Sequence, residues 1–288
     1  MHGSPKQKLE CALYVVATPI GNMGDITLRA LEILASSDVI AAEDTRNTAN
    51  LLNHHGIAAG RLMALHQHNE RSATEGVIQT LAQGLSVALV TDAGTPAISD
   101  PGALLVQSVR ESGFRVVPIP GPNAALTALS ASGLHAAHFL FYGFLPSKPA
   151  ARRRELQALA HLPYTLIFYE APHRILECVA DLLEAFGGHR RLILARELTK
   201  MFENIHSCML DEAAEWLRSD ANNQRGEFVL LVSAADAPAD ERKADAERIL
   251  SILIEELPLK QAVQLAAKIS EFSRNQLYQQ ALLLYKQK

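Results

Sequence analysis

The sequence predicts an α/β fold with two domains and a small helical C-terminal tail. In the first region, short apolar runs and helical patterns alternate five times between Leu13 and Pro118. This alternation is typical of a mostly parallel sheet that is covered by helices on both faces. The second region, from Phe139 to Val232, has aromatic strands and less regular helices, which favours an α+β domain with a mixed sheet. From Ala246 onward the patterns are helical.

The first predicted domain spans residues 11–121. Its expected strands are short and mainly apolar, and they cover residues 13–17, 39–42, 62–66, 86–90 and 115–118. Its expected helices have apolar residues at helical spacing, and they cover residues 27–36, 48–55, 74–83 and 103–112. The proline-rich run 118–123 cannot continue a helix and makes a stiff connector, so we place the domain boundary there.

The second predicted domain spans residues 122–235. It begins with an expected helix over 124–132, and the remaining elements follow in chain order. Strands are expected over 139–144, 164–169, 191–195, 205–210 and 227–232, with helices over 150–160, 172–186 and 211–218. The polar stretch 234–245 is a predicted linker. The third predicted domain, residues 246–288, is helical with a break at Leu257-Pro258 and has the pattern of a short helix-turn-helix unit.

Composition and charge favour a globular cytoplasmic protein. Hydrophobic residues make up 48% of the chain and charged residues 20%, and no run approaches the roughly 20 apolar residues that span a bilayer. The segment 1–10 is polar and lacks the apolar core of a signal peptide. Cys11, Cys178 and Cys208 are widely spaced, which indicates neither a disulfide framework nor a zinc site and fits a reducing compartment. With a net charge of −4, any contact with RNA must come from local patches.

The loop 91–102, between an expected strand and an expected helix, is the first candidate for a binding site. The carboxyl ends of parallel strands meet at one edge of a sheet, so this loop can converge with the loops 18–25 and 43–46. Asp100-Pro101 suits the N-cap and first position of the following helix. A rigid turn without a ligand is the simpler interpretation, but two Asp, two Thr and a Ser are more than a turn requires. Neither a G-x-G-x-x-G run nor a Walker A lysine motif is present.

Two further clusters in the first domain allow more than one interpretation. Glu43 and Asp44 stand beside Arg46, which fits a general base as well as the capped start of a helix. His66 and His68 would point to opposite faces of a continuing strand, which is poor geometry for a metal site. A solvated or RNA-facing loop is therefore favoured for the histidines.

The second domain carries charged clusters at strand ends and one basic patch. The runs 168–174, 195–203 and 225–227 combine Arg and Glu, which fits site residues or ordinary ion pairs. The basic patch lies beside the aromatic run 141–144 and consists of Lys148, Arg152, Arg153 and Arg154. Such a patch is compatible with RNA phosphates and stacked bases, and also with a solvated helix start.

Several motifs together resemble those of the tetrapyrrole methylase superfamily, in order along residues 12 to 288. The runs that carry the resemblance are 16–22, 42–46, 91–102, 120–123, 142–146, 168–174, 195–200 and 225–229. The first-domain motifs indicate only the superfamily. The strings Glu43-Asp44-Thr45-Arg46 and Arg196-Glu197-Leu198-Thr199-Lys200 are similar to its RNA-modifying branch, the 2′-O-methyltransferases of small-subunit ribosomal RNA. Thr95 stands where the tetrapyrrole enzymes usually have Asp.

The resemblance implies a tetrapyrrole-methylase-like fold and a homodimer that binds S-adenosylmethionine between its two domains. It implies methyl transfer to the ribose 2′-hydroxyl of a cytidine in 16S ribosomal RNA, within the assembled small subunit, without a membrane partner. The implied cofactor-binding residues are Pro19, Ile20, Gly94, Thr95, Pro96, Ala97, Ile98, Asn123, Ala124, Tyr169, Glu197 and Glu227. Asp44 or Glu43 would take the hydroxyl proton, Arg46 and Lys200 would bind phosphate, and no metal is expected.

Two other functions remain open from the sequence. One is methylation of a tetrapyrrole or another small molecule. The helix-turn-helix-like tail and the basic patch argue against it, because a small substrate needs neither. The other is a non-catalytic RNA-binding module, which the intact loop 91–102 argues against.

Overall fold

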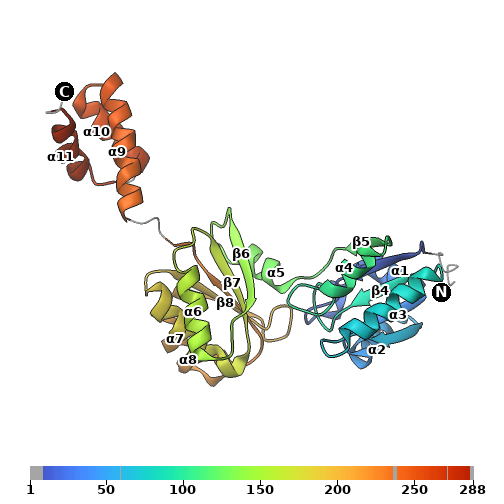
Figure 1. Ribbon diagram of the computed structural model, residues 1–288. Coiled ribbons are helices and arrows are strands. Elements are labelled where there is room, and N and C mark those ends of the chain that lie inside the picture. The colour runs from blue at the N-terminus through green and yellow to red at the C-terminus, as the bar shows by residue number, and fades with distance from the viewer. Residues whose placement is uncertain (1–8, 59, 236–238, 271, 286–288) are drawn as a thin grey trace. The chain divides into compact units, whose positions relative to one another are not determined.

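The computed structural model describes residues 9–58, 60–235, 239–270 and 272–285 (Figure 1). Most of the predicted polar N-terminal segment, part of the predicted linker and the last three residues of the predicted tail therefore lie outside the described residues. The chain divides into two compact units, residues 1–234 and residues 235–288.

A parallel sheet forms the centre of the first lobe, which confirms the predicted α/β layer. Its strands pair in the order β3-β2-β4-β1-β5, all parallel. They are β1 Ala12–Val16, β2 Val39–Ala42, β3 Arg61–Ala64, β4 Val87–Val90 and β5 Arg115–Ile119. The connecting helices are α1 Leu28–Ser36, α2 Thr45–His54, α3 Glu70–Ala82 and α4 Ala103–Glu111, with a 3-10 turn, η1, at Met23–Asp25. Leu13 and Tyr14 pack in separate clusters on opposite sheet faces, which is why β2 and β4 are apolar throughout.

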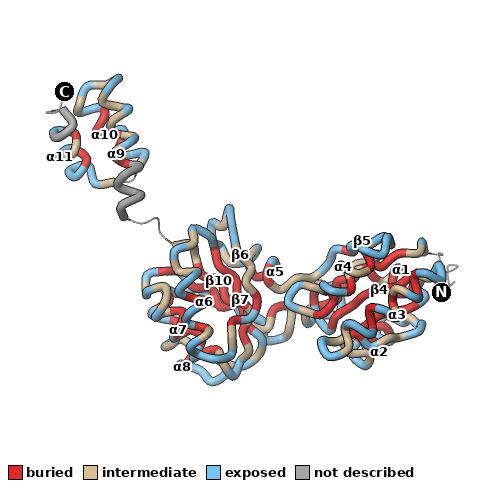
Figure 2. The backbone as a smooth tube through the Cα atoms, viewed as in Figure 1, coloured by how far each residue is buried: buried red, intermediate tan, exposed pale blue. Residues whose placement is uncertain are grey.

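A mixed sheet forms the second lobe, as the aromatic strands predict. Its order is β6-β7-β10-β8-β9, with β6 parallel to β7 and the other pairs antiparallel. The strands are β6 Phe139–Phe144, β7 Thr165–Glu170, β8 Arg191–Arg196, β9 Asn204–Met209 and β10 Phe228–Val232. The helices are α5 Ala124–Ala131, α6 Pro149–Leu159, α7 Ile175–Phe186 and α8 Ala213–Ser219, with 3-10 turns η2 Pro172–Arg174 and η3 Ala221–Gln224. Buried strands run through the centre of both lobes (Figure 2).

The predicted basic patch on α6 is wrong for Arg152, whose side chain is 1% exposed. Its Nε donates to Asp181 Oδ2 on α7 at 2.5 Å. Arg152 and the buried Leu156 lie one helical turn apart, so both belong to the face of α6 that packs on α7. Arg153 pairs with Asp181 and Glu184, and Arg154 with Glu155, so carboxylates offset these charges.

The described residues of the second unit form three helices, which confirms the predicted helical tail. They are α9 Ala239–Glu256, α10 Leu259–Ser270 and α11 Arg274–Tyr285, and the expected break falls between α9 and α10. Leu250, Val263 and Leu277 contribute one buried side chain from each helix to a small core. Among the described residues, no helix combines the length and apolar character that a membrane span requires. The three-part division predicted from the sequence stays a prediction.

Candidate functional site

The loops that follow β1 and β4 are joined at the carboxyl edge of the parallel sheet. Thr18 N donates to Gly94 O at 2.8 Å, and Gly94 N donates to Thr18 O at 3.0 Å. The buried Thr18 hydroxyl also donates to Thr91 O at 3.0 Å. This short bridge fixes both loops together, as expected for strand ends that meet at one edge.

The loop 91–102 has an irregular backbone before α4. Gly94, Ala97, Ser99 and Gly102 all have positive φ, at 82°, 66°, 64° and 124°. The predicted placement of Asp100-Pro101 at the N-cap and first position is wrong, because Gly102 occupies the N-cap, whereas the start of α4 at Ala103 agrees with the helix predicted over 103–112. Gly102 N instead donates to Glu70 Oε1 on α3 at 2.9 Å. The positive φ angles of the non-glycine residues cost conformational free energy, and strained backbone of this kind is most common at functional sites.

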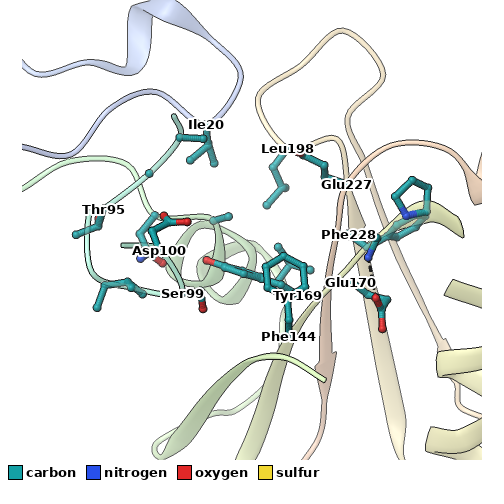
Figure 3. Close-up of a pocket in the computed structure, with 18 residues that line it drawn as sticks. Ile20, Thr95, Ser99, Asp100, Phe144, Tyr169, Glu170, Leu198, Glu227 and Phe228 are labelled. Atoms are coloured by element: carbon teal, nitrogen blue, oxygen red, sulfur yellow. Dashed lines mark hydrogen bonds between the residues drawn. The ribbon is translucent and has the colours of Figure 1, made fainter. Parts of the chain in front are cut away.

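Both lobes contribute to a cavity of about 340 Å³ at this edge, which we name the first cavity (Figure 3). Its lining is largely apolar. It consists of Ile20, Ala93, Gly94, Thr95, Ile98, Ser99, Asp100, Asn123, Ala124, Phe144, Tyr169, Glu170, Ala171, Pro172, Leu198, Glu227, Phe228 and Val229. A cavity of this volume lies within the usual range of small-molecule sites, roughly 300–1,000 Å³.

Eight of the twelve predicted cofactor residues line the first cavity. They are Ile20, Gly94, Thr95, Ile98, Asn123, Ala124, Tyr169 and Glu227. The Thr95 hydroxyl donates to Pro122 O at 3.1 Å, so this side chain ties the loop to the interlobe connector. Asn123 caps α5 by accepting a hydrogen bond from Leu126 N at 3.1 Å. The assignment of these residues to a cofactor stays a prediction.

Asp100 is a charged residue of this cavity that was not among the site residues predicted from the sequence. Burial, followed by the nearby charges of Glu43 and Asp92, raises the pKa of Asp100 to about 6. Among the residues that the structure describes, no cation pairs with its carboxyl group. The two Asp residues of the loop indicate from the sequence that it carries negative charge. The direction in which the Asp100 side chain points depends on the residues with positive φ around it. A carboxyl group of this kind is suited to meet a cationic ligand.

Tyr169 extends across the first cavity toward the loop of Asp100 (Figure 3). Its hydroxyl accepts a hydrogen bond from Ala125 N at 3.2 Å, and its ring lies edge-on to Phe141 and Phe144. Burial raises the pKa of Tyr169, so the side chain stays a neutral phenol. Tyr169 therefore gives the cavity a fixed aromatic wall.

A second cavity of about 340 Å³ adjoins the first and shares Ile20, Ala93 and Glu227 with it. The rest of its lining comes from the loop after β1, from α2, and from Thr91, Asp92 and Lys200. The complete lining is Thr18, Pro19, Ile20, Gly21, Met23, Asn47, Thr48, Asn50, Leu51, Thr91, Asp92, Ala93, Lys200 and Glu227. Of the remaining predicted residues, Pro19 and Lys200 lie here, whereas Pro96, Ala97 and Glu197 line neither cavity.

Lys200 is held between two carboxylates in the turn after β8. Its Nζ lies 2.9 Å from Glu197 Oε1 and 2.9 Å from Glu227 Oε2. Burial lowers the pKa of Lys200, but these two hydrogen bonds outweigh it and raise that pKa. The Lys200 stem also packs on Gly21 of the first lobe, where an added Cβ would stand 2.6 Å from Lys200 Cγ. Lys200 thus connects the two lobes.

The predicted catalytic residues Glu43, Asp44 and Arg46 surround Asp92 and line neither cavity. Asp44 caps α2 and pairs with Arg46, whose hydrogen bonds lower the pKa of Asp44 to about 2. Glu43 Oε2 accepts a hydrogen bond from Asp92 N at 3.3 Å. Of the two interpretations left open by the sequence, the helix cap is present in the structure.

The His66–His68 pair lies beyond the end of β3, with ring centroids 6.0 Å apart. Within the described ranges, no group of three or more His, Cys, Asp or Glu residues is arranged to hold a metal ion.

Comparisons with known proteins match nearly the whole chain. Residues 12–214 match the family described as Tetrapyrrole (Corrin/Porphyrin) Methylases, and residues 240–284 match the RsmI C-terminal HTH domain. The chain is 53% identical over 272 residues to Ribosomal RNA small subunit methyltransferase I of Pseudomonas aeruginosa, covering 94% of this chain and 96% of that one. It is 52% identical over 270 residues to the protein of that name from Escherichia coli O157:H7, covering 94% of both chains.

Solved structures share the fold at much lower identity. The methyltransferase CobJ covers 78% of this chain and 94% of its own, with a TM-score of 0.59 and 20% identity. Uroporphyrin-III C-methyl transferase from Thermus thermophilus, solved with S-adenyl homocysteine, covers 77% of this chain and 97% of its own, with a TM-score of 0.55 and 19% identity. The chain therefore belongs to the tetrapyrrole methylase family and, within it, to the ribosomal RNA small subunit methyltransferase I group.

Proposed function

We propose that this chain transfers a methyl group from S-adenosylmethionine to the ribose 2′-hydroxyl of a cytidine in 16S ribosomal RNA. The observation that carries the proposal is the first cavity, which has an apolar lining, walls from both lobes and the Asp100 carboxyl, for which no ion-pair partner is present among the described residues. The RNA substrate is supported by the relatives named ribosomal RNA small subunit methyltransferase I.

The residues of the first cavity fit the chemistry of S-adenosylmethionine. The ligand is a small molecule with a positively charged sulfur and an ammonium group. Asp100 offers the negative charge that either cation requires, and Ile20, Leu198 and Val229 offer apolar surface. Gly94 lets the loop backbone form part of the wall at a φ of 82°.

The residues of the chain would act mainly by binding and orienting the reactants. Bound S-adenosylmethionine supplies an activated methyl group on a cationic sulfur. The apolar walls exclude water, and the Asp100 carboxylate offsets the positive charge of the bound donor. Tyr169, fixed by Ala125 N, limits the positions open to a ligand, so orientation supplies much of the rate acceleration.

The proposal includes a homodimer that acts in the cytoplasm on the assembled small subunit. A second copy is supported by apolar side chains at the free edge of the second sheet. Met201 and Phe202, in the turn before β9, are 90% and 67% exposed, and Ile205 and Met209 on β9 are also exposed. Light scattering at micromolar concentration tests the dimer, and a monomeric mass would contradict it.

Methyl transfer from tritiated S-adenosylmethionine tests the proposed reaction. The acceptors are purified small subunits, free 16S RNA and corrinoid precursors, assayed side by side. We expect incorporation into RNA with no incorporation into the precursors. Ribose methylation is then mapped in ribosomal RNA from a strain without the gene, where one 2′-O-methylcytidine should be lost. Transfer to the corrinoid precursor alone would overturn the proposal.

A further inference from the structure

The second cavity adjoins the first but differs from it in chemistry. Its own lining includes the side-chain amides of Asn47 and Asn50 and the carboxylate of Asp92. Asp92 is followed directly by Ala93, which lines both cavities. A group bound at Asp92 therefore lies close to the wall that the two cavities share.

The charges of the second cavity favour a neutral, hydroxyl-rich ligand over a phosphate. The charged side chains among its described lining residues are Asp92, Glu227 and Lys200. Lys200 is the cation, and its ammonium group is already bound to Glu197 and Glu227. This leaves a negative lining that repels a phosphodiester, whereas sugar hydroxyls can donate to Asp92 and bond with the amides. The role of Lys200 as a phosphate ligand, expected from the sequence, is disfavoured on this ground.

Asp92 is held in a fixed orientation by the start of α2. Its Oδ1 accepts a hydrogen bond from Asp44 N at 3.1 Å, and its Oδ2 accepts one from Asn47 Nδ2 at 2.9 Å. Its own backbone N–H donates to Glu43 Oε2. Each carboxylate oxygen can accept more than one hydrogen bond, so both oxygens keep capacity for a ligand.

We propose that the second cavity receives the ribose of the acceptor nucleotide and that Asp92 is the proton acceptor for its 2′-hydroxyl. This inference rests on the proposed function. In the transfer step the hydroxyl oxygen bonds to the methyl carbon as the methyl–sulfur bond breaks. The electron pair of that bond returns to sulfur, which becomes a neutral thioether, and the hydroxyl proton passes to the Asp92 carboxylate. The phosphates stay outside the cavity, away from its negative lining.

In this arrangement Glu43 and Asp44 are positioning residues, because they hold Asp92 through two hydrogen bonds and line neither cavity. Asn47 also orients Asp92, and it lines the second cavity itself. The carboxylates predicted from the sequence therefore contribute through Asp92 and not by direct contact with the hydroxyl.

The test compares Asp92→Asn, Asp92→Glu and the control Glu32→Gln, an exposed carboxylate on α1 that lines neither cavity. For each full-length variant we measure the Kd of S-adenosylmethionine by calorimetry, the thermal midpoint, and kcat and KM on small subunits. Loss of a general base costs typically 100-fold to 10,000-fold in rate. We expect Asp92→Asn to lose kcat in this range, with KM for subunits and the donor Kd within about threefold of wild type. Asp92→Glu should recover part of kcat, and Glu32→Gln should match wild type.

Two results would overturn the inference while leaving the proposed function intact. One is an active wild-type enzyme whose Asp92→Asn variant keeps kcat within threefold. The other is an Asp92→Asn variant that binds the donor more weakly or has a lower thermal midpoint than wild type, together with an Asp92→Glu variant that recovers none of kcat. A wild-type chain that binds the donor but methylates no small-subunit RNA would instead overturn the proposed function.

Discussion

Replacing Asp100 by Asn should remove a pH dependence from donor binding. The cavity raises the pKa of the Asp100 carboxyl to about 6, so the group changes charge between weakly acidic and neutral solution. If the ionised form is the one that binds a cationic donor, the apparent Kd is the intrinsic Kd divided by the ionised fraction. That fraction is about nine-tenths near pH 7 and about one-tenth near pH 5, so affinity should fall about tenfold across this interval.

The assay is calorimetric titration with S-adenosylmethionine between pH 5 and pH 8, in buffers of different ionisation enthalpy. Because a bound cation lowers the pKa of a neighbouring acid, wild-type binding near pH 6 should release protons to the buffer. Asp100→Asn should bind more weakly at neutral pH, with a Kd that no longer changes with pH. Glu32→Gln, on α1 and outside both cavities, is the control and should keep the wild-type pH dependence. A flat wild-type profile, or the same pH dependence in Asp100→Asn, would refute the reasoning.

The same carboxyl group should make the free protein less stable at neutral pH. Its folded-state pKa lies above the ordinary value of 3.8, so the folded chain binds this proton more tightly than the unfolded chain. The stabilising contribution is therefore fully present below about pH 4 and is lost as the pH rises through about 6. The whole shift corresponds to about 3 kcal/mol, and partial solvent exposure reduces it to about 1–2 kcal/mol. Asp100→Asn should accordingly unfold at higher denaturant concentration than wild type at pH 7, a common exchange of function for stability.

Three other substitutions test the packing around the site. Arg152→Ala leaves the buried Asp181 with only its longer contact to Arg153, at 3.6 Å, and should lower the free energy of unfolding by about 3–5 kcal/mol in urea titrations; a loss below 1 kcal/mol would contradict the buried pair. Gly102→Ala combines a φ of 124° with a Cβ 2.8 Å from Leu89 Cδ2, so it should cost about 1–3 kcal/mol and lower the thermal midpoint; an unchanged midpoint would show that the loop relaxes freely. Asp44→Ala removes the cap of α2 and should cost about 0.5–2 kcal/mol, whereas Asp44→Asn should keep most of it in the same measurement.

The layers of this fold follow from local patterns, whereas the site depends on contacts that local patterns do not encode. Runs such as Val87–Val90, apolar at every position, are sufficient to predict buried parallel strands. The parallel order then brings the loops after β1 and β4 to one edge, and the bridge between Thr18 and Gly94 is a direct consequence. Four of the eight predicted residues in the first cavity, Ile20, Gly94, Thr95 and Ile98, come from these two loops.

The pairing of charges could not be predicted in the same way. In the sequence Arg152 belongs to a basic run. In the structure Arg152 lies on the buried face of α6, one helical turn before the buried Leu156. Glu197 and Glu227 are thirty residues apart, and only the antiparallel pairing of β8 with β10 brings both to Lys200. The direction of Asp100 depends on backbone torsions at Ala97 and Ser99, which are residues without a strong preference for positive φ.

The contact between Gly21 and Lys200 has a consequence for the lifetime of a bound ligand. Gly21 lies against the Lys200 stem so closely that even a methyl group would collide with Lys200 Cγ and Thr199 Oγ1. An alanine at position 21 would push the two lobes apart. A larger separation of the lobes should shorten the residence time of a molecule that is bound between them. We therefore expect the lack of a side chain at Gly21 to lengthen the time for which a ligand stays bound between the lobes.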